Sequence, residues 1–154
     1  MRITLNDSEM LQAALIGCTR HIENLTGKTP VKNNYGAPEE RDWQFHVDGA
    51  MGEMALAKYL NRFYAGRGER GAPDVGDDEV RTTHYSSGHL VLHPRDPPDR
   101  RAWLLTGLNG KYMVRGWIMI REGQQQRFWG VKKAKDRPAF WVPQEALHER
   151  NSQP

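Results

Sequence analysis

Four carboxylates crowd into six positions of the segment GAPDVGDDEVRTT (residues 71–83), and they are Asp74, Asp77, Asp78 and Glu79. Charges of one sign at this density repel one another, so the segment needs either water or a cation around it. A turn over GDD would place Asp77 and Asp78 at a solvated tip. Side chains alternate along a strand, so Glu79 and Arg81 would share one face, with Asp74 beside them on the preceding strand. We therefore predict that Asp74 and Glu79 are the functional pair, and that Asp77 and Asp78 are solvated turn residues.

A third carboxylate, Glu53, lies in HVDGAMGEMALAKYLNRF, which we predict to form a helix from about Val47 to Phe63. At 3.6 residues per turn, Glu53 falls on the face that carries small and apolar side chains. A carboxylate on a buried face is costly unless something compensates its charge. The alternative is a glutamate favoured by the helix dipole near the N-terminus, although Asp48 suits that role better, as an N-cap. We expect Glu53 to reach the acidic pair.

Carboxylates that converge from separate segments make a hard oxygen site, the kind that Mg²⁺ or Mn²⁺ prefers. A divalent ion there would activate a water molecule and neutralise charge on a phosphate. Arg81 beside the ion could hold a phosphate or stabilise the developing charge. These residue types therefore predict metal-assisted phosphoryl chemistry.

At these positions the sequence resembles the PD-(D/E)XK nuclease superfamily, and in particular its small phage-type members. Pro73-Asp74 is similar to the first part of the family motif and Glu79-Val80-Arg81 to the second, while Gly52-Glu53 is similar to the helix that contributes a glutamate. The segment YMVRGWI, residues 112–118, looks like the strand that follows the core motif. The resemblance covers residues 42–120, and the N-terminal helix lies outside it.

The resemblance implies a restriction-endonuclease-like core with an added N-terminal helix and a Mg²⁺- or Mn²⁺-dependent nuclease that hydrolyses phosphodiester bonds, in DNA rather than RNA. The metal ligands that it implies are Asp74, Glu79 and the carbonyl of Val80, with Glu53 binding directly or through water. The lysine of the family motif is Arg81 here. Because arginine stays charged, it cannot act as a base, although it can orient water or bind phosphate.

Two alternatives to a nuclease stay open. The Arg81 departure suggests a nuclease-fold protein that binds nucleic acid or a host protein without cleavage. The acidic segment could also be only a turn, in a phage structural or interaction protein. The residues do not distinguish endonuclease from exonuclease action, nor do they give sequence specificity or the oligomeric state.

The elements that must position the acidic residues follow from the hydrophobic pattern. Asn6 and Glu9 have capping-box spacing at the start of a predicted helix over residues 6–25. The helix is amphipathic, and its apolar stripe consists of Met10, Leu11, Ala14, Leu15, Cys18, Ile22 and Leu25. Strands are predicted at residues 73–75, 79–83, 89–93, 102–106, 112–120 and 140–142. A short helix is expected after Pro143.

Helices followed by strands predict an α+β class with a mixed, mostly antiparallel central sheet flanked by helices. The length of 154 residues suits one domain, which we divide into a helix and loop (1–40), a nuclease-like core (41–120) and a basic hairpin with the C-terminal segment (121–154).

Charge is unevenly distributed along a chain whose formal net charge is +3. Residues 100–137 hold ten Lys or Arg and two acidic residues, which suits a polyanion partner. Within this region we predict four backbone contacts to nucleic acid, and they are Lys132, Lys133, Lys135 and Arg137. A solvated charged surface is the alternative. A single cysteine, the lack of a signal-peptide pattern and the lack of a long apolar run indicate the cytoplasm (the host cytoplasm if phage-encoded) and no membrane.

Overall fold

A computed structural model describes residues 1–27, 41–66, 72–132 and 138–149. Its larger sheet has the strand order β1-β5-β4-β2. These strands are β1 (Arg2–Thr4), β2 (Asp78–Thr83), β4 (Arg101–Leu108) and β5 (Lys111–Met119). Strand β2 pairs in parallel with β4, whereas the other two pairings are antiparallel. The sheet is therefore mixed and mostly antiparallel, as predicted, and β2 lies at one edge.

The β4–β5 hairpin forms because its connection is Asn109-Gly110, the residue pair favoured in tight hairpin turns. Both residues have positive φ, 52° for Asn109 and 76° for Gly110. The hairpin forms the centre of the larger sheet, and an apolar core packs on each of its two faces.

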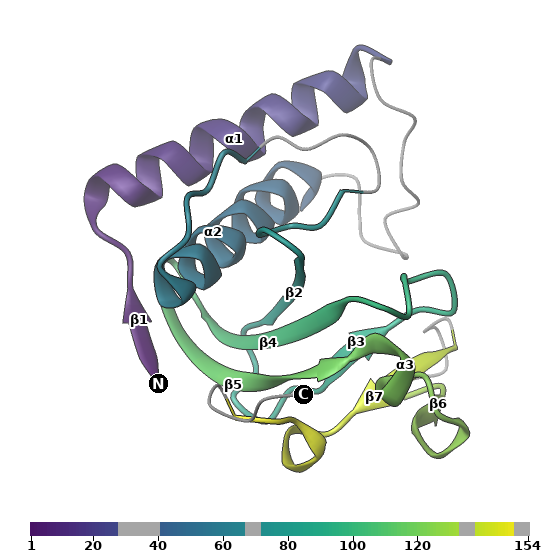
Figure 1. Ribbon diagram of the computed structural model, residues 1–154. Coiled ribbons are helices and arrows are strands. Elements are labelled where there is room, and N and C mark those ends of the chain that lie inside the picture. The colour runs from purple at the N-terminus through teal and green to yellow at the C-terminus, as the bar shows by residue number, and fades with distance from the viewer. Residues whose placement is uncertain (28–40, 67–71, 133–137, 150–154) are drawn as a thin grey trace.

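Helix α2 (Asp42–Leu60) lies on one face of this sheet, and α1 (Asp7–Leu25) packs on α2 (Figure 1). On the other face of the larger sheet packs a smaller sheet with the order β3-β7-β6, formed by β3 (Leu90–Leu92), β6 (Trp129–Gly130) and β7 (Ala139–Val142). Short helical segments are α3 (Ile120–Gly123), η2 (Gln126–Phe128) and η3 (Gln144–Ala146). The α+β class is confirmed, but the long helices cover one face of the sheet and a second sheet covers the other.

Two apolar cores hold these three layers together. Leu56, Trp103 and Leu105 are buried between the helices and the larger sheet. Leu92 and Leu104 belong to a second cluster, between the two sheets. Alternate residues of β4 serve the two cores, as expected for a strand that is buried on both faces. None of the helices in the described parts of the chain is both long and apolar enough to cross a membrane.

Several predicted boundaries needed correction. Strands β1 and β6, which are three and two residues long, were not predicted. Residues 73–75 do not form a strand; a single bridge joins Val75 to Asp78. Helix α2 begins at Asp42, so Asp48 is not an N-cap but an interior residue that accepts a hydrogen bond from Gln44 at 2.6 Å. The helical turn predicted after Pro143 is present as η3.

The capping box of Asn6 and Glu9 at the start of α1 is present, as predicted, but most large side chains of its apolar stripe are exposed. Ala13, Gly17 and His21 are the buried residues, whereas Leu15 is 61% exposed. The reason is close approach between helices. A Cβ on Gly17 would lie 2.6 Å from the Cα of Val47 in α2, so small residues, rather than the leucines, face α2.

This close approach makes Gly17 sensitive to substitution. We expect Gly17→Ala to lower the free energy of unfolding by about 1–3 kcal/mol, because a methyl group would meet the α2 backbone. Gly49→Ala in α2 is the matched control, since a Cβ there has no neighbour within 4 Å. The control should gain about 0.5–1 kcal/mol from helix propensity. Urea unfolding measures both, and equal effects of the two substitutions would contradict the packing.

Candidate functional site

The acidic segment folds as a two-residue turn that leads into the edge strand β2. Val75 and Asp78 exchange main-chain hydrogen bonds of 3.0 Å, and Gly76 has a φ of 61°, which glycine adopts without strain. This places Asp74 against the outer edge of β2, where its Oδ2 accepts a hydrogen bond of 2.9 Å from the main-chain N–H of Val80. The edge position of β2 matters, because a neighbouring strand would otherwise bind that N–H group.

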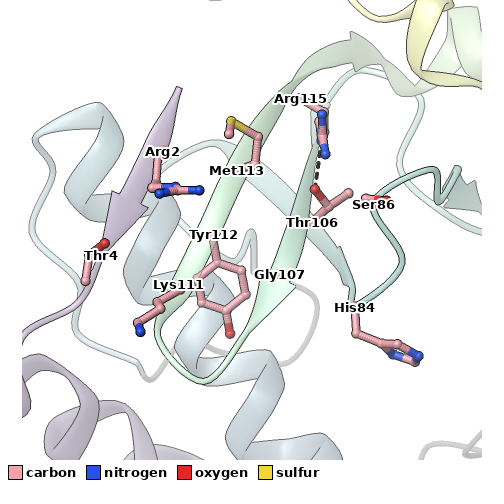
Figure 2. Close-up of a pocket in the computed structure, with 10 residues that line it drawn as sticks. All are labelled: Arg2, Thr4, His84, Ser86, Thr106, Gly107, Lys111, Tyr112, Met113 and Arg115. Atoms are coloured by element: carbon pink, nitrogen blue, oxygen red, sulfur yellow. Dashed lines mark hydrogen bonds between the residues drawn. The ribbon is translucent and has the colours of Figure 1, made fainter.

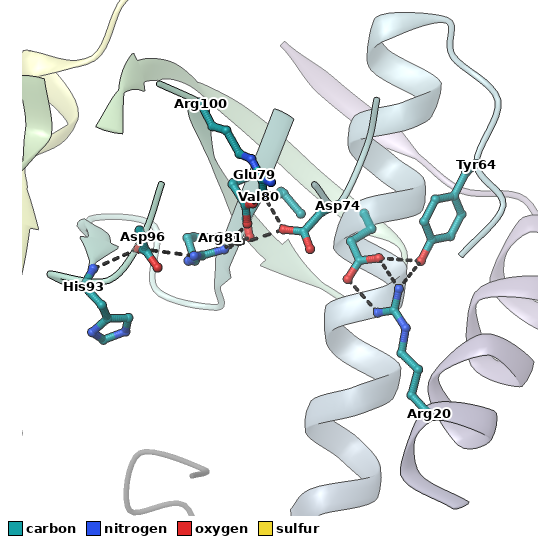
Figure 3. A network of polar contacts seen from close by, with 10 residues as sticks. Arg20, Tyr64, Asp74, Glu79, Val80, Arg81, His93, Asp96 and Arg100 are labelled. Carbon is teal, nitrogen blue, oxygen red and sulfur yellow. Dashed lines mark hydrogen bonds and ion pairs between the residues drawn. The ribbon is translucent and has the colours of Figure 1, made fainter. Parts of the chain in front are cut away.

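The guanidinium of Arg81 lies among the groups predicted as metal ligands (Figure 3). Its Nη1 is 3.1 Å from the carbonyl oxygen of Val80, 3.4 Å from Oε2 of Glu79 and 3.6 Å from Oδ2 of Asp74. We call these three oxygens the oxygen cradle. Its Nη2 lies 3.4 Å from Oδ2 of Asp96. The oxygen cradle thus holds a cationic group, supplied by the chain itself.

Further contacts fix the two ends of this network. Arg100 donates a 2.7 Å hydrogen bond to the other oxygen of Glu79, and the main-chain N–H of His93 donates 2.8 Å to Asp96. Burial lowers the pKa of Arg81, but the negative charges of Asp96, Asp74 and Glu79 outweigh it and leave the pKa of Arg81 raised. The guanidinium is therefore bound firmly as a cation.

Glu53 is buried, as predicted, and its charge acts on Asp74, but both of its oxygens are bound by other side chains. Arg20 of α1 binds both of them, with Nη1–Oε1 at 2.7 Å and Nη2–Oε2 at 2.6 Å. The hydroxyl of Tyr64 donates a further 2.7 Å hydrogen bond to Oε2. Burial and the charge of Glu53 raise the pKa of Tyr64, so it remains a donor. The compensating charge for Glu53 is an arginine from the N-terminal helix.

The negative charges of Glu53 and Glu79 both act on the carboxyl group of Asp74. Burial, followed by the charge of Glu53, raises its pKa from an ordinary 3.8 to about 7. The hydrogen bond from Val80 and the charge of Arg81 act in the opposite direction, while Glu79 raises the pKa further. A carboxylate that ionises near neutrality at a sheet edge is typical of functional sites.

Asp78 was predicted to be a solvated turn residue, and that prediction was wrong. Its side chain is fully buried. Arg62 Nη1 lies 2.7 Å from one carboxylate oxygen and Arg101 Nε lies 2.7 Å from the other. The bridge with Val75 sets Asp78 at the base of the turn rather than at its tip, where Asp77 is exposed as predicted. Asp78 therefore anchors β2 to the segment that follows α2.

Four residues that bind the carboxylates or the guanidinium of this site were not predicted from the sequence, and they are Arg20, Tyr64, Asp96 and Arg100. A signal was present only for Arg20, which lies on the same face of α1 as the small residues Ala13 and Gly17. That small face marks a helix contact, and Arg20 reaches the partner helix from it. Asp96 and Arg100 lie in a loop whose path the sequence pattern did not indicate.

The basic C-terminal region is only partly visible. Lys132 is exposed, whereas Lys133, Lys135 and Arg137 lie outside the described residues.

Within the described ranges, no three side chains of His, Cys, Asp or Glu come together as a ready metal-binding group. Comparison of the chain with family models, curated proteins and solved structures gave no match.

The raised pKa of Asp74 predicts how stability depends on pH. Between about pH 4 and pH 7 the folded protein keeps a proton that the unfolded chain has released, so stability falls as pH rises through this window. Asp74→Asn removes this dependence while keeping an acceptor for Val80. Its stability relative to wild type should rise by roughly 2–4 kcal/mol from about pH 4 to about pH 8.

Urea unfolding at a series of pH values measures this difference, and Asp77→Asn at the exposed tip is the control, with a flat difference expected. Parallel pH profiles for Asp74→Asn and wild type would show that Asp74 ionises at its ordinary pKa.

Proposed function

We propose that the protein is a divalent-metal-dependent nuclease that hydrolyses phosphodiester bonds in DNA. One observation carries the proposal: two carboxylates and a main-chain carbonyl from the acidic segment surround a single cationic nitrogen, Nη1 of Arg81. The resemblance to the PD-(D/E)XK motif involves these same residues. A single cysteine suits a reducing compartment, and we propose the cytoplasm as the place of action.

The residues of the oxygen cradle fit a hard divalent ion in their chemistry. Asp74, Glu79 and the carbonyl of Val80 supply oxygen only, the donor set that Mg²⁺ and Mn²⁺ prefer. The guanidinium of Arg81 is a stand-in that shows where these oxygens direct their negative charge. We do not include Glu53 among the direct ligands, because Arg20 binds both of its oxygens.

When bound, Mg²⁺ supplies an activated water molecule and neutralises charge at the phosphate. The chain's own residues do the rest. Asp74 and Glu79 hold the site at the edge of β2, and Glu53 with its partner Arg20 sets the charge around Asp74. Arg81 has a second acceptor in Asp96, which can retain the guanidinium beside the oxygen cradle, where it can bind a phosphate oxygen.

A second candidate function is binding of nucleic acid or a host protein without cleavage. The observation that favours it is the position of Arg81, because an internal cation already neutralises the oxygen cradle. Arginine, unlike the lysine of the family motif, also cannot serve as a base. Under this second proposal the acidic residues serve mainly to hold Arg81.

Cleavage of plasmid and single-stranded DNA in Mg²⁺ or Mn²⁺, with RNA in parallel, tests the nuclease. We expect Asp74→Asn and Glu79→Gln to lower the rate by about 100-fold or more, as loss of groups that stabilise developing charge does. Asp77→Asn is the matched control, since it removes an exposed carboxylate of the same turn, and its rate should be within about twofold of wild type.

Arg81→Lys keeps the charge and supplies the lysine of the family motif, so we expect it to retain or raise the rate. DNA binding by wild type without cleavage in either metal would reject the nuclease and support the second candidate. Equal rates for Asp74→Asn and Asp77→Asn would assign the cleavage to a contaminant.

A further inference from the structure

A pocket of about 440 Å³ lies on the larger sheet (Figure 2). It is lined by His84, which directly follows β2, whereas the acidic turn precedes β2. Strands β1, β4 and β5 and the loop after β2 form its walls. The side chains that define its character are Arg2, His84, Ser86, Thr106, Lys111 and Arg115. No Asp or Glu of the described chain lines it.

The cations of this pocket differ from the other arginines near the site. Arg20, Arg62 and Arg81 each lie within 3.4 Å of a carboxylate oxygen. Neither Arg2 nor Lys111 has a carboxylate partner in the part of the chain that the structure describes, and the same holds for Arg115. Three uncompensated cations around one concave surface favour an anionic ligand.

Hydroxyl donors and aromatic rings accompany these charges. Nε of Arg115 donates a 2.7 Å hydrogen bond to Thr106, which fixes the guanidinium on the pocket wall. His84 lines the pocket, and its ring lies 3.9 Å from that of Tyr85, a side chain that is 59% exposed. Exposed rings beside basic residues are the arrangement on which the bases of single-stranded nucleic acid stack.

We propose that this pocket binds the sugar–phosphate backbone of a single strand, with a base stacked on Tyr85 and His84. His84 lies three residues beyond Arg81, about 10 Å at the rise of a strand. A nucleic-acid strand with one phosphate at the oxygen cradle therefore reaches the pocket within a few nucleotides. The choice of polymer rests on the proposed function, but binding to the pocket requires no cleavage.

Fluorescence anisotropy with a labelled oligodeoxythymidylate in EDTA tests the pocket without cleavage. We expect Arg2→Glu with Lys111→Glu to raise Kd at least about tenfold and to reduce the salt dependence of binding, because two phosphate contacts are lost. Arg121→Glu with Arg127→Glu is the matched control, since it makes the same change of net charge at exposed arginines outside the pocket. Tyr85→Ala should raise Kd about fivefold or more through lost stacking.

Equal losses in the two double variants, or tighter binding of a duplex than of the single strand, would overturn the proposal. Lys111→Glu alone is the second variant if the pair fails to fold, because Lys111 is exposed on a hairpin. Wild type that binds the oligonucleotide through the pocket but never cleaves would reject the nuclease and leave this inference standing. Cleavage by wild type, with no effect of the pocket substitutions on binding, would support the nuclease and overturn this inference.

The apolar stripe of α1 carries a second, independent inference. Five members of the stripe follow one another at alternating spacings of four and three, the heptad pattern of a coiled-coil seam, and they are Leu11, Leu15, Cys18, Ile22 and Leu25. The four leucine and isoleucine side chains are 48–67% exposed. A continuous apolar face of this size on a helix is typical of an interaction site.

The composition of the chain indicates what covers this stripe. The residues that the structure does not describe include only two large apolar side chains, Val31 and Tyr35, too few to match the seam. Gln12 and Thr19, which flank the stripe, are uncharged, so two copies can approach without repulsion. We infer that a second copy of the chain pairs through α1.

Sedimentation equilibrium over a wide concentration range tests the pairing. We expect a monomer–dimer equilibrium for wild type and a fall of at least about tenfold in the association constant for Leu15→Glu, because the substitution places a charge in the seam. Leu108→Glu, at a 43% exposed leucine next to the β4–β5 turn, is the matched control and should associate as wild type does. A wild-type protein that stays monomeric, or a Leu15→Glu variant that still dimerises, would overturn the inference.

Discussion

Charge compensation of buried carboxylates is the constraint on which this structure depends. Glu53, Asp78 and Glu79 are all buried, and each lies within 2.7 Å of an arginine nitrogen. An unpaired carboxylate at such depth would lose several kcal/mol relative to water, so loss of one partner is costly even where the pair adds little net stability. Arg20 of α1 joins that helix to α2 through Glu53, whereas Arg62 after α2 and Arg100 just before β4 hold the edge strand β2 through Asp78 and Glu79.

Asp74 stands apart from this pattern. It lies 3.6 Å from Arg81, farther than the other acids lie from their closest partners, and its pKa is raised to about 7. A residue that weakens the fold when it ionises is best explained by function, since a neutral side chain would serve the structure better. The same reasoning explains why Arg81, with acceptors on both sides, is the group best placed to exchange with an external cation.

The sequence predicted those features that depend on local pattern. Strand alternation correctly joined Glu79 and Arg81, and the glycine at position 76 correctly marked the turn. Ion-pair partners that are distant in the sequence could not be predicted. Nothing near Glu53 indicates that Arg20, 33 residues earlier, neutralises the Glu53 carboxylate. The exposure of the α1 stripe was not predicted, because hydrophobicity alone does not show whether an apolar stripe is buried in the core. The parallel pairing of β2 with β4 likewise depends on the path of residues 84–100, in which only β3 is regular.

The central claim is that Arg81 and a divalent ion compete for the same three oxygens. Crystals soaked in MnCl₂, with anomalous diffraction used to locate the metal, test it most directly. The account predicts a manganese peak among the carboxylates of Asp74 and Glu79 and the carbonyl of Val80, with the guanidinium displaced toward Asp96. At saturating Mn²⁺, a guanidinium still seated among those oxygens, with no manganese beside it, would contradict the account.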